Sequence, residues 1–359
     1  MFRILAMAGG GLRGAFAIGF LEAIERRLGG SLWDHFDLIA GTSTGAITAS
    51  ALCRGTTAKE MRAFYEKHAA AIFHPRPPRT PKRAFAPLYP LARNYVQKRI
   101  GRNLDHFFGS RYCPDSLEAS MVEGFADETM SDARCCRLII PAVNLTDGVT
   151  CIFRSPHLSR PREEYRWKIK DVILAATAAP TYFPHKVMPD GKDYADGGLW
   201  AIDPGVVAIS EAARIRRCQT EESPAGAARG PSGEVWPSPE QAAFDSTDIH
   251  LLSLGTGKAS YSLAAPGSDA GMLFWSKHVA DVMSISQVQG TELPLKIFLG
   301  DRYRPYNFEL RDPSWSMDNV DMIDELFAIG NESGDQAFGE LEATYFATKV
   351  EPPRYYTEA

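Results

Sequence analysis

The sequence predicts an α/β protein with a mostly parallel central sheet flanked by helices. Two apolar, strand-like runs, at residues 2–8 and 36–40, each end in a glycine-rich turn that leads into a helix-like segment. Repeated strand, turn and helix units are typical of parallel sheets, because parallel neighbours need a crossover connection. With 359 residues, 45% of them hydrophobic, the chain can bury a sizeable core.

The first of these units contains a glycine pattern with two interpretations. Gly9, Gly11 and Gly14 fit G-x-G-x-x-G, and the helix after them has apolar residues at helical intervals: Phe16, Phe20, Ala23, Ile24 and Leu28. Such a turn directs unpaired backbone N–H groups and the positive end of a helix dipole toward negative charge. That charge is either the pyrophosphate of a dinucleotide or the oxyanion of an acyl-transfer reaction.

The second unit favours the oxyanion. Residues 41–45, GTSTG, place Ser43 at the apex of a sharp strand-to-helix turn, where Gly41 and Gly45 remove side chains that would crowd the bend. This turn occupies the place where a dinucleotide site would need an acidic residue. Adjacent parallel strands open onto one crevice, so both turns should face one site. We therefore predict an oxyanion hole from the first turn: Gly9, Gly10, Gly11, Leu12, Arg13 and Gly14.

Further segments complete a single domain over residues 1–350. Strands are expected within 136–145 and 248–257, and a helix that ends at a proline turn is expected within 171–184. Residues 75–104 carry eight Lys or Arg, no acidic residue and interleaved aromatic residues, which favours a lid or a membrane-binding segment. Residues 219–247 are rich in Pro, Gly, Ser and Ala and predict a flexible insertion.

Composition limits the partners and the compartment. The formal net charge of -5 and the pI near 6.0 argue against binding a nucleic-acid polymer. No apolar run approaches the ~20 residues of a membrane span, and the first residues lack a secretory signal, so we expect a cytoplasmic protein that associates with membranes peripherally. The six cysteines show no zinc spacing and are expected to be reduced thiols. No metal ion and no other cofactor is expected.

A serine nucleophile needs a base, and the strongest candidate is Asp196. It lies in YADGGLW, where Gly197 and Gly198 form a tight turn that exposes its carboxylate. A Ser-His-Asp esterase of the α/β-hydrolase type, with His250 or His278 as the base, is the alternative. The second alternative is a catalytically idle lipid-binding protein that retained the fold.

These motifs resemble those of the patatin-like phospholipase family. The resemblance rests on GGGLRG at 9–14, GTSTG at 41–45 and DGG at 196–198, and it extends over residues 2–345 through ATAAPTYFP at 176–184 and LLSLGTG at 251–257. The sequence departs from the family pattern at Ala8, where an acidic residue is frequent, and at Ile202 and Asp203, where asparagines are frequent.

The resemblance implies a function as well as a three-layer fold. Family members are acyl hydrolases with a Ser-Asp dyad, which here would be Ser43 and Asp196. The implied reaction releases fatty acids from a phospholipid membrane surface through an acyl-enzyme. Some relatives are bacterial effectors that a cyclic dinucleotide activates during anti-phage defence, so a cyclic dinucleotide activator is implied here too. The sequence leaves a homo-oligomer open.

Overall fold

A computed structural model of the chain describes residues 1–76, 94, 109–158, 162–220, 228–229, 235–236, 248–258, 270–310 and 315–356. The predicted lid or membrane segment at 75–104 and the predicted insertion at 219–247 therefore lie largely outside the described residues. No helix within the described ranges is both long and apolar enough to cross a bilayer.

The core of the fold is a mixed eight-stranded sheet in the order β10-β9-β1-β2-β3-β6-β5, with β4 paired to β3 beside this path. Its strands are β1 (Phe2–Met7), β2 (Leu38–Gly41), β3 (Arg137–Asn144), β4 (Val149–Arg154), β5 (Lys186–Val187), β6 (Asp193–Asp196), β9 (Ile249–Leu254) and β10 (Tyr303–Tyr306). The first five strands of the path are parallel, and the pairings of β4, β5 and β6 are antiparallel. A separate hairpin joins β7 (Ala228–Arg229) and β8 (Val235–Trp236).

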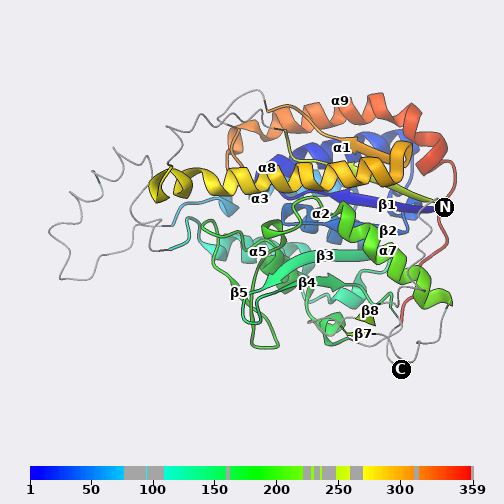
Figure 1. The fold of residues 1–359 in the computed structure, drawn as a ribbon. Coiled ribbons are helices and arrows are strands. Elements are labelled where there is room, and N and C mark those ends of the chain that lie inside the picture. Colours follow the sequence, from blue (N-terminus) through cyan, green and yellow to red (C-terminus); the bar gives the residue numbers. More distant parts are fainter. Residues whose placement is uncertain are drawn as a thin grey trace.

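Helices cover both faces of the sheet (Figure 1). One face is covered by α1 (Ala15–Leu28), α2 (Thr44–Cys53), α3 (Ala58–Ile72), α5 (Pro114–Phe125), α6 (Ile169–Ala176) and α9 (Ile323–Leu341). The other face is covered by α7 (Gly205–Thr220) and α8 (Met272–Leu299). This arrangement confirms the predicted three-layer α/β fold with a mostly parallel sheet.

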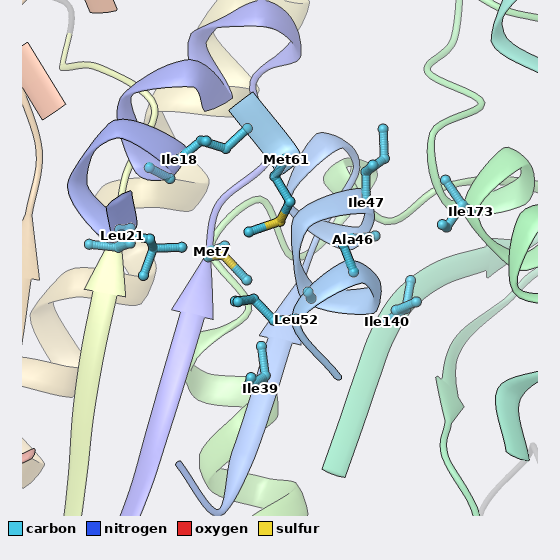
Figure 2. Packing of buried hydrophobic residues seen from close by; sticks show 14 of the residues in the cluster. Met7, Ile18, Leu21, Ile39, Ala46, Ile47, Leu52, Met61, Ile140 and Ile173 are labelled. Carbon is cyan, nitrogen blue, oxygen red and sulfur yellow. The ribbon is translucent and has the colours of Figure 1, made fainter. Parts of the chain in front are cut away.

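Strand β1 illustrates how the layers form. Leu5 and Met7 point into the core beneath α1 and α2, whereas Ile4 and Ala6 point into the core beneath α7 and α8. Alternating side chains of a strand face opposite sides of its sheet, so an apolar strand buried on both faces belongs in the middle layer. Figure 2 shows the first of these cores, with Met7 between the strands and the covering helices.

The register of β3 positions the candidate site. Strand β2 pairs with residues 137–139 of β3 and runs parallel to it, whereas β6 pairs with residues 142–144 and runs the opposite way. Both lie on the side of β3 that β4 does not occupy. The carboxyl ends of β2 and β6 therefore face each other along one edge of β3.

Candidate active site

Ser43 joins β2 to α2 in a conformation that few L-residues adopt. Its φ is 54° and its ψ is -123°, which lifts the side chain clear of the sheet. A Cβ atom on Gly41 would lie 2.1 Å from the carbonyl oxygen of Gly45, and one on Gly45 would lie 2.3 Å from that of Met7. Glycine is thus required at both positions for this turn to form.

Asp196, the last residue of β6, is the hydrogen-bond partner of Ser43. The Ser43 hydroxyl donates to Asp196 Oδ2 at 2.6 Å, and the backbone N–H of Gly198 donates to Oδ1 at 2.7 Å. The carboxylate is 3% exposed. Burial raises the pKa of Asp196 to about 6, and the bonds from Ser43 and Gly198 limit the rise. The carboxylate is therefore a stronger proton acceptor than an exposed aspartate.

The glycine-rich loop between β1 and α1 lines the same cavity as Ser43, and only some of its backbone N–H groups have hydrogen-bond acceptors among the described residues. Three N–H groups donate to backbone carbonyl oxygens: Gly9 to Ile202 at 2.9 Å, Leu12 to Met317 at 2.8 Å and Arg13 to Gly10 at 3.3 Å. No described residue accepts a hydrogen bond from the N–H of Gly10 or Gly11. Of the six predicted oxyanion-hole residues, these two have donors available, while Gly14 caps α1.

Side chains that the sequence did not indicate hold this loop in place. Thr256 Oγ1 donates to the Gly9 carbonyl at 2.7 Å, and Tyr65 OH donates to the Gly11 carbonyl at 2.9 Å. A Cβ on Gly10 would lie 2.3 Å from Thr256 Oγ1, so the backbone of Gly10 is in direct contact with the Thr256 side chain. Thr256 belongs to the LGTG segment noted above, whereas the sequence around Tyr65 indicates only a helix.

Arg13, one of the predicted oxyanion-hole residues, directs its side chain to the backbone of the same loop. Arg13 Nε donates to the Gly10 carbonyl at 3.4 Å, and burial lowers the pKa of the guanidinium. The side chain is half-buried, near Tyr182 and Asp281. In this structure Arg13 braces the turn.

A cavity of about 320 Å³ opens next to Ser43 and Asp196. Its wall is mostly apolar and includes Phe64, Ile72, Phe73, Leu117, Phe183 and Met283. An apolar cavity beside a nucleophile and N–H donors suits the hydrocarbon chain of an acyl group.

The histidines of the alternative triad lie elsewhere. His250 is in the first half of β9, opposite Arg3, whereas Ser43 follows the far ends of the strands. His278 is on α8, with its ring 4.6 Å from that of Phe274. His68 lines the cavity, but its Nδ1 lies 3.1 Å from Ser120 Oγ. No described histidine hydrogen-bonds to Ser43, and the described residues contain no group of three or more potential metal ligands.

A G-x-S-x-G serine at a strand end, paired with a carboxylate in a mixed α/β fold, is the arrangement of an acyl hydrolase. The model of the patatin-like phospholipase family matches residues 5–204, and the chain belongs to that family. It is accordingly a lipid acyl hydrolase.

Two curated relatives are named phospholipases. A cGAMP-activated phospholipase of Vibrio cholerae is 32% identical over 277 residues, which are 75% of this chain and 68% of the relative. A cGAMP-activated phospholipase of Pseudomonas aeruginosa is 26% identical over 99% of this chain and 95% of the relative. Among solved structures, VipD from Legionella pneumophila is 13% identical and matches with a TM-score of 0.42, over 96% of this chain and 67% of that one.

Proposed function

We propose that this protein releases fatty acids from membrane phospholipids with Ser43 as nucleophile and Asp196 as base. The observation that carries the proposal is the 2.6 Å hydrogen bond between these side chains, beside an apolar cavity and the N–H groups of Gly10 and Gly11. A carboxylate serves as base here because burial raises its pKa to about 6 and its acceptor atom already contacts the hydroxyl.

The first half-reaction forms an acyl-enzyme. Asp196 accepts the hydroxyl proton as Ser43 Oγ attacks the ester carbonyl carbon, and the carbonyl oxygen becomes an oxyanion that accepts hydrogen bonds from Gly10 and Gly11. The oxyanion then collapses and the bond to the glycerol oxygen breaks. Asp196 returns its proton to that oxygen, so a lysolipid leaves and the acyl group remains on Ser43.

The second half-reaction reverses these roles. A water molecule gives a proton to Asp196 and attacks the acyl carbon, and the same two N–H groups stabilise the second oxyanion. The bond to Ser43 Oγ breaks, Oγ takes the proton from Asp196, and the fatty acid leaves.

The cavity opening is the side that would face the bilayer. The first turns of α8 project at the end of the molecule where the parallel strands end (Figure 1). There Met272 is 88% and Trp275 44% exposed, and the exposed Val279 and Met283 one and two turns later line the cavity itself. These four apolar residues, at helical spacing on α8, would let a lipid chain pass from the bilayer toward the cavity.

The described start of the basic segment, residues 75–76, lies beside the same opening. The backbone of Arg76 pairs with that of Arg111, and the Arg111 N–H donates to the carbonyl of Thr181 in the cavity wall at 2.8 Å. The guanidinium of Arg76 at this edge suits the phosphate groups of a phospholipid surface.

The names of the relatives support an activator. The Vibrio cholerae and Pseudomonas aeruginosa relatives are cGAMP-activated phospholipases. We propose that a cyclic dinucleotide likewise activates this protein, as part of anti-phage defence. Size-exclusion chromatography with and without the nucleotide would report whether activation accompanies homo-oligomer formation.

The test is fatty-acid release from mixed phospholipid vesicles, with and without cGAMP and other cyclic dinucleotides. Ser43→Ala and Asp196→Asn should both lose release, whereas Ser210→Ala and Asp324→Asn, at exposed positions on α7 and α9, should retain it. Release that survives in Asp196→Asn but fails in His250→Gln or His278→Gln would establish a triad instead. Vesicle binding without release under every condition would favour the idle lipid-binding alternative.

A further inference from the structure

The oxyanion loop is held from outside by a segment near the end of the chain, residues 315–319. The Met317 carbonyl accepts the N–H of Leu12 at 2.8 Å, and a Cβ on Gly11 would lie 2.2 Å from that carbonyl oxygen. Met317 also lines the cavity. The position of Met317 therefore determines where the neighbouring donors of Gly10 and Gly11 point.

Met317 is in turn fixed by the side chain of Asp318. This side chain is 7% exposed and accepts three hydrogen bonds, from Ser316 Oγ at 2.6 Å, Arg111 Nη1 at 2.6 Å and the Tyr112 hydroxyl. All three partners donate, so the site is built for a carboxylate.

Arg111 and Tyr112, which hold the Asp318 side chain, are also bonded to the segment that contacts Asp196. The backbone N–H groups of Arg111 and Tyr112 donate to the carbonyls of Thr181 and Tyr182 at 2.8 and 2.9 Å. A few residues earlier, the Ala178 carbonyl accepts the N–H of Asp196 at 3.2 Å. Residues 178–182 thus contact both the backbone of Asp196 and the two residues, Arg111 and Tyr112, that hold Asp318.

We propose that Asp318 is a positioning residue that fixes the oxyanion loop relative to the Ser43–Asp196 pair. The inference rests on the proposed role of that loop. A glycine-rich loop is conformationally permissive, and misplacement of a catalytic group by about 1 Å can reduce turnover about 100-fold. An external brace therefore supplies the rigidity that the loop sequence lacks.

Asp318→Asn tests this directly, because the amide keeps the size of the side chain but replaces one acceptor oxygen with an N–H donor. That donor would face either the Ser316 hydroxyl, now bonded to Oδ1, or Arg111 and Tyr112, now bonded to Oδ2. We expect kcat on a short, monomeric ester to fall about 10- to 100-fold per titrated active site, with KM changed less than about twofold. Asp321→Asn, on the exposed residue three positions later, is the matched control and should behave as the unaltered protein.

A pair of ketone inhibitors separates positioning from general damage. A long-chain trifluoromethyl ketone forms an oxyanion on Ser43, whereas the corresponding methyl ketone binds the cavity largely as the neutral carbonyl. Asp318→Asn should weaken the trifluoromethyl ketone by about the factor lost in kcat and leave the methyl ketone unchanged. Equal weakening of both inhibitors, or of neither, would overturn the proposal.

Two further measurements keep the outcome interpretable. If Asp318→Asn fails to fold, Ser316→Ala removes one bond to the same carboxylate from an exposed position, and it should give the same pattern at about threefold. If Ser316→Ala does not selectively weaken binding of the trifluoromethyl ketone, the proposal is wrong. If the unaltered protein itself binds both ketones equally, the proposed hydrolytic function fails.

Discussion

Ser43 and Asp196 stand 153 residues apart in the chain, yet the hydroxyl of one lies 2.6 Å from the carboxylate of the other. They meet because β2 and β6 approach each other from opposite directions along one edge of β3. The opposite directions of β2 and β6 thus bring the two side chains together.

The pKa of Asp196 should determine the acid limb of the pH profile. The base must be ionised to accept the Ser43 proton, and its pKa is raised to about 6 by burial, against the bonds from Ser43 and Gly198. We expect kcat/KM for a soluble ester to be constant above pH 7 and about tenfold below this plateau at pH 5. His250→Gln and His278→Gln should not move the midpoint. A midpoint near 4 would contradict the raised pKa of Asp196, and a midpoint that a histidine substitution shifts would argue against Asp196 as the base.

The same carboxylate should reduce stability at neutral pH. Its pKa in the folded protein lies above the ordinary value of 3.8, so the folded state binds the proton more tightly. Its contribution is most favourable below pH 4 and is lost as the pH rises through about 6. Asp196→Asn should therefore raise the free energy of unfolding by up to about 3 kcal/mol at pH 8 but little at pH 4, while abolishing turnover.

Urea unfolding at both pH values would measure this difference. Asp324→Asn, on the exposed side of α9, should change the free energy of unfolding at neither pH. An Asp196→Asn protein that is less stable than the unaltered one at pH 8 would contradict the burial argument.

The turn at Gly45 should tolerate no side chain. A Cβ there would lie 2.3 Å from the carbonyl oxygen of Met7, so β1 and the turn would have to separate. Gly45→Ala should lower the free energy of unfolding by about 1–3 kcal/mol and reduce turnover further through displacement of Ser43. Gly30→Ala is the control, because a Cβ at Gly30 has no neighbour within 4 Å. Thermal unfolding and ester turnover of both variants would test the prediction; near-normal turnover in Gly45→Ala would contradict it.

The exposed tip of α8 should bind lipid without contributing to catalysis. Met272 and Trp275 are exposed and do not line the cavity. Met272→Ser/Trp275→Ser should weaken binding to anionic phospholipid vesicles about tenfold and leave turnover of a monomeric ester unchanged. Vesicle flotation measures the first quantity and an ester assay the second.

The far end of the same helix supplies the matched control. Ile297 and Phe298 are 70% and 69% exposed, and Ile297 lies about 37 Å along the helix from Met272. Ile297→Ser/Phe298→Ser should leave vesicle binding unchanged. Equal losses at both ends, together with a change in oligomeric state, would identify α8 as an interface between copies of this chain instead.

The fold was predictable where local sequence determines it. The apolar run of β1, the glycine turn after it and the helical spacing of α1 depend on neighbouring residues, and so do the shape requirements of the turn at Ser43. The three-layer class follows from repetition of such units. The antiparallel course of β6 and its register on β3 depend on contacts between distant segments, which no local pattern encodes.

The candidate site also combines parts that local sequence predicts with parts that depend on distant segments. The turns that carry Ser43 and Asp196 have recognisable local sequences. The supports of the oxyanion loop do not: Tyr65 and Asp318 lie 54 and about 300 residues along the chain from the loop, in segments with no distinguishing pattern. Which backbone N–H groups of the loop are already hydrogen-bonded likewise depends on distant residues. The carbonyls of Ile202 and Met317 accept those of Gly9 and Leu12, and the N–H groups of Gly10 and Gly11 are left to bind an oxyanion.

The role of Ser43 as nucleophile is tested most directly by the mass of the protein quenched in acid during turnover of a slowly hydrolysed ester. We expect one acyl group per chain, on the peptide that contains Ser43, and no adduct on Ser43→Ala. Acylation of a different residue, or continued turnover by Ser43→Ala, would contradict the assignment of Ser43 as the nucleophile.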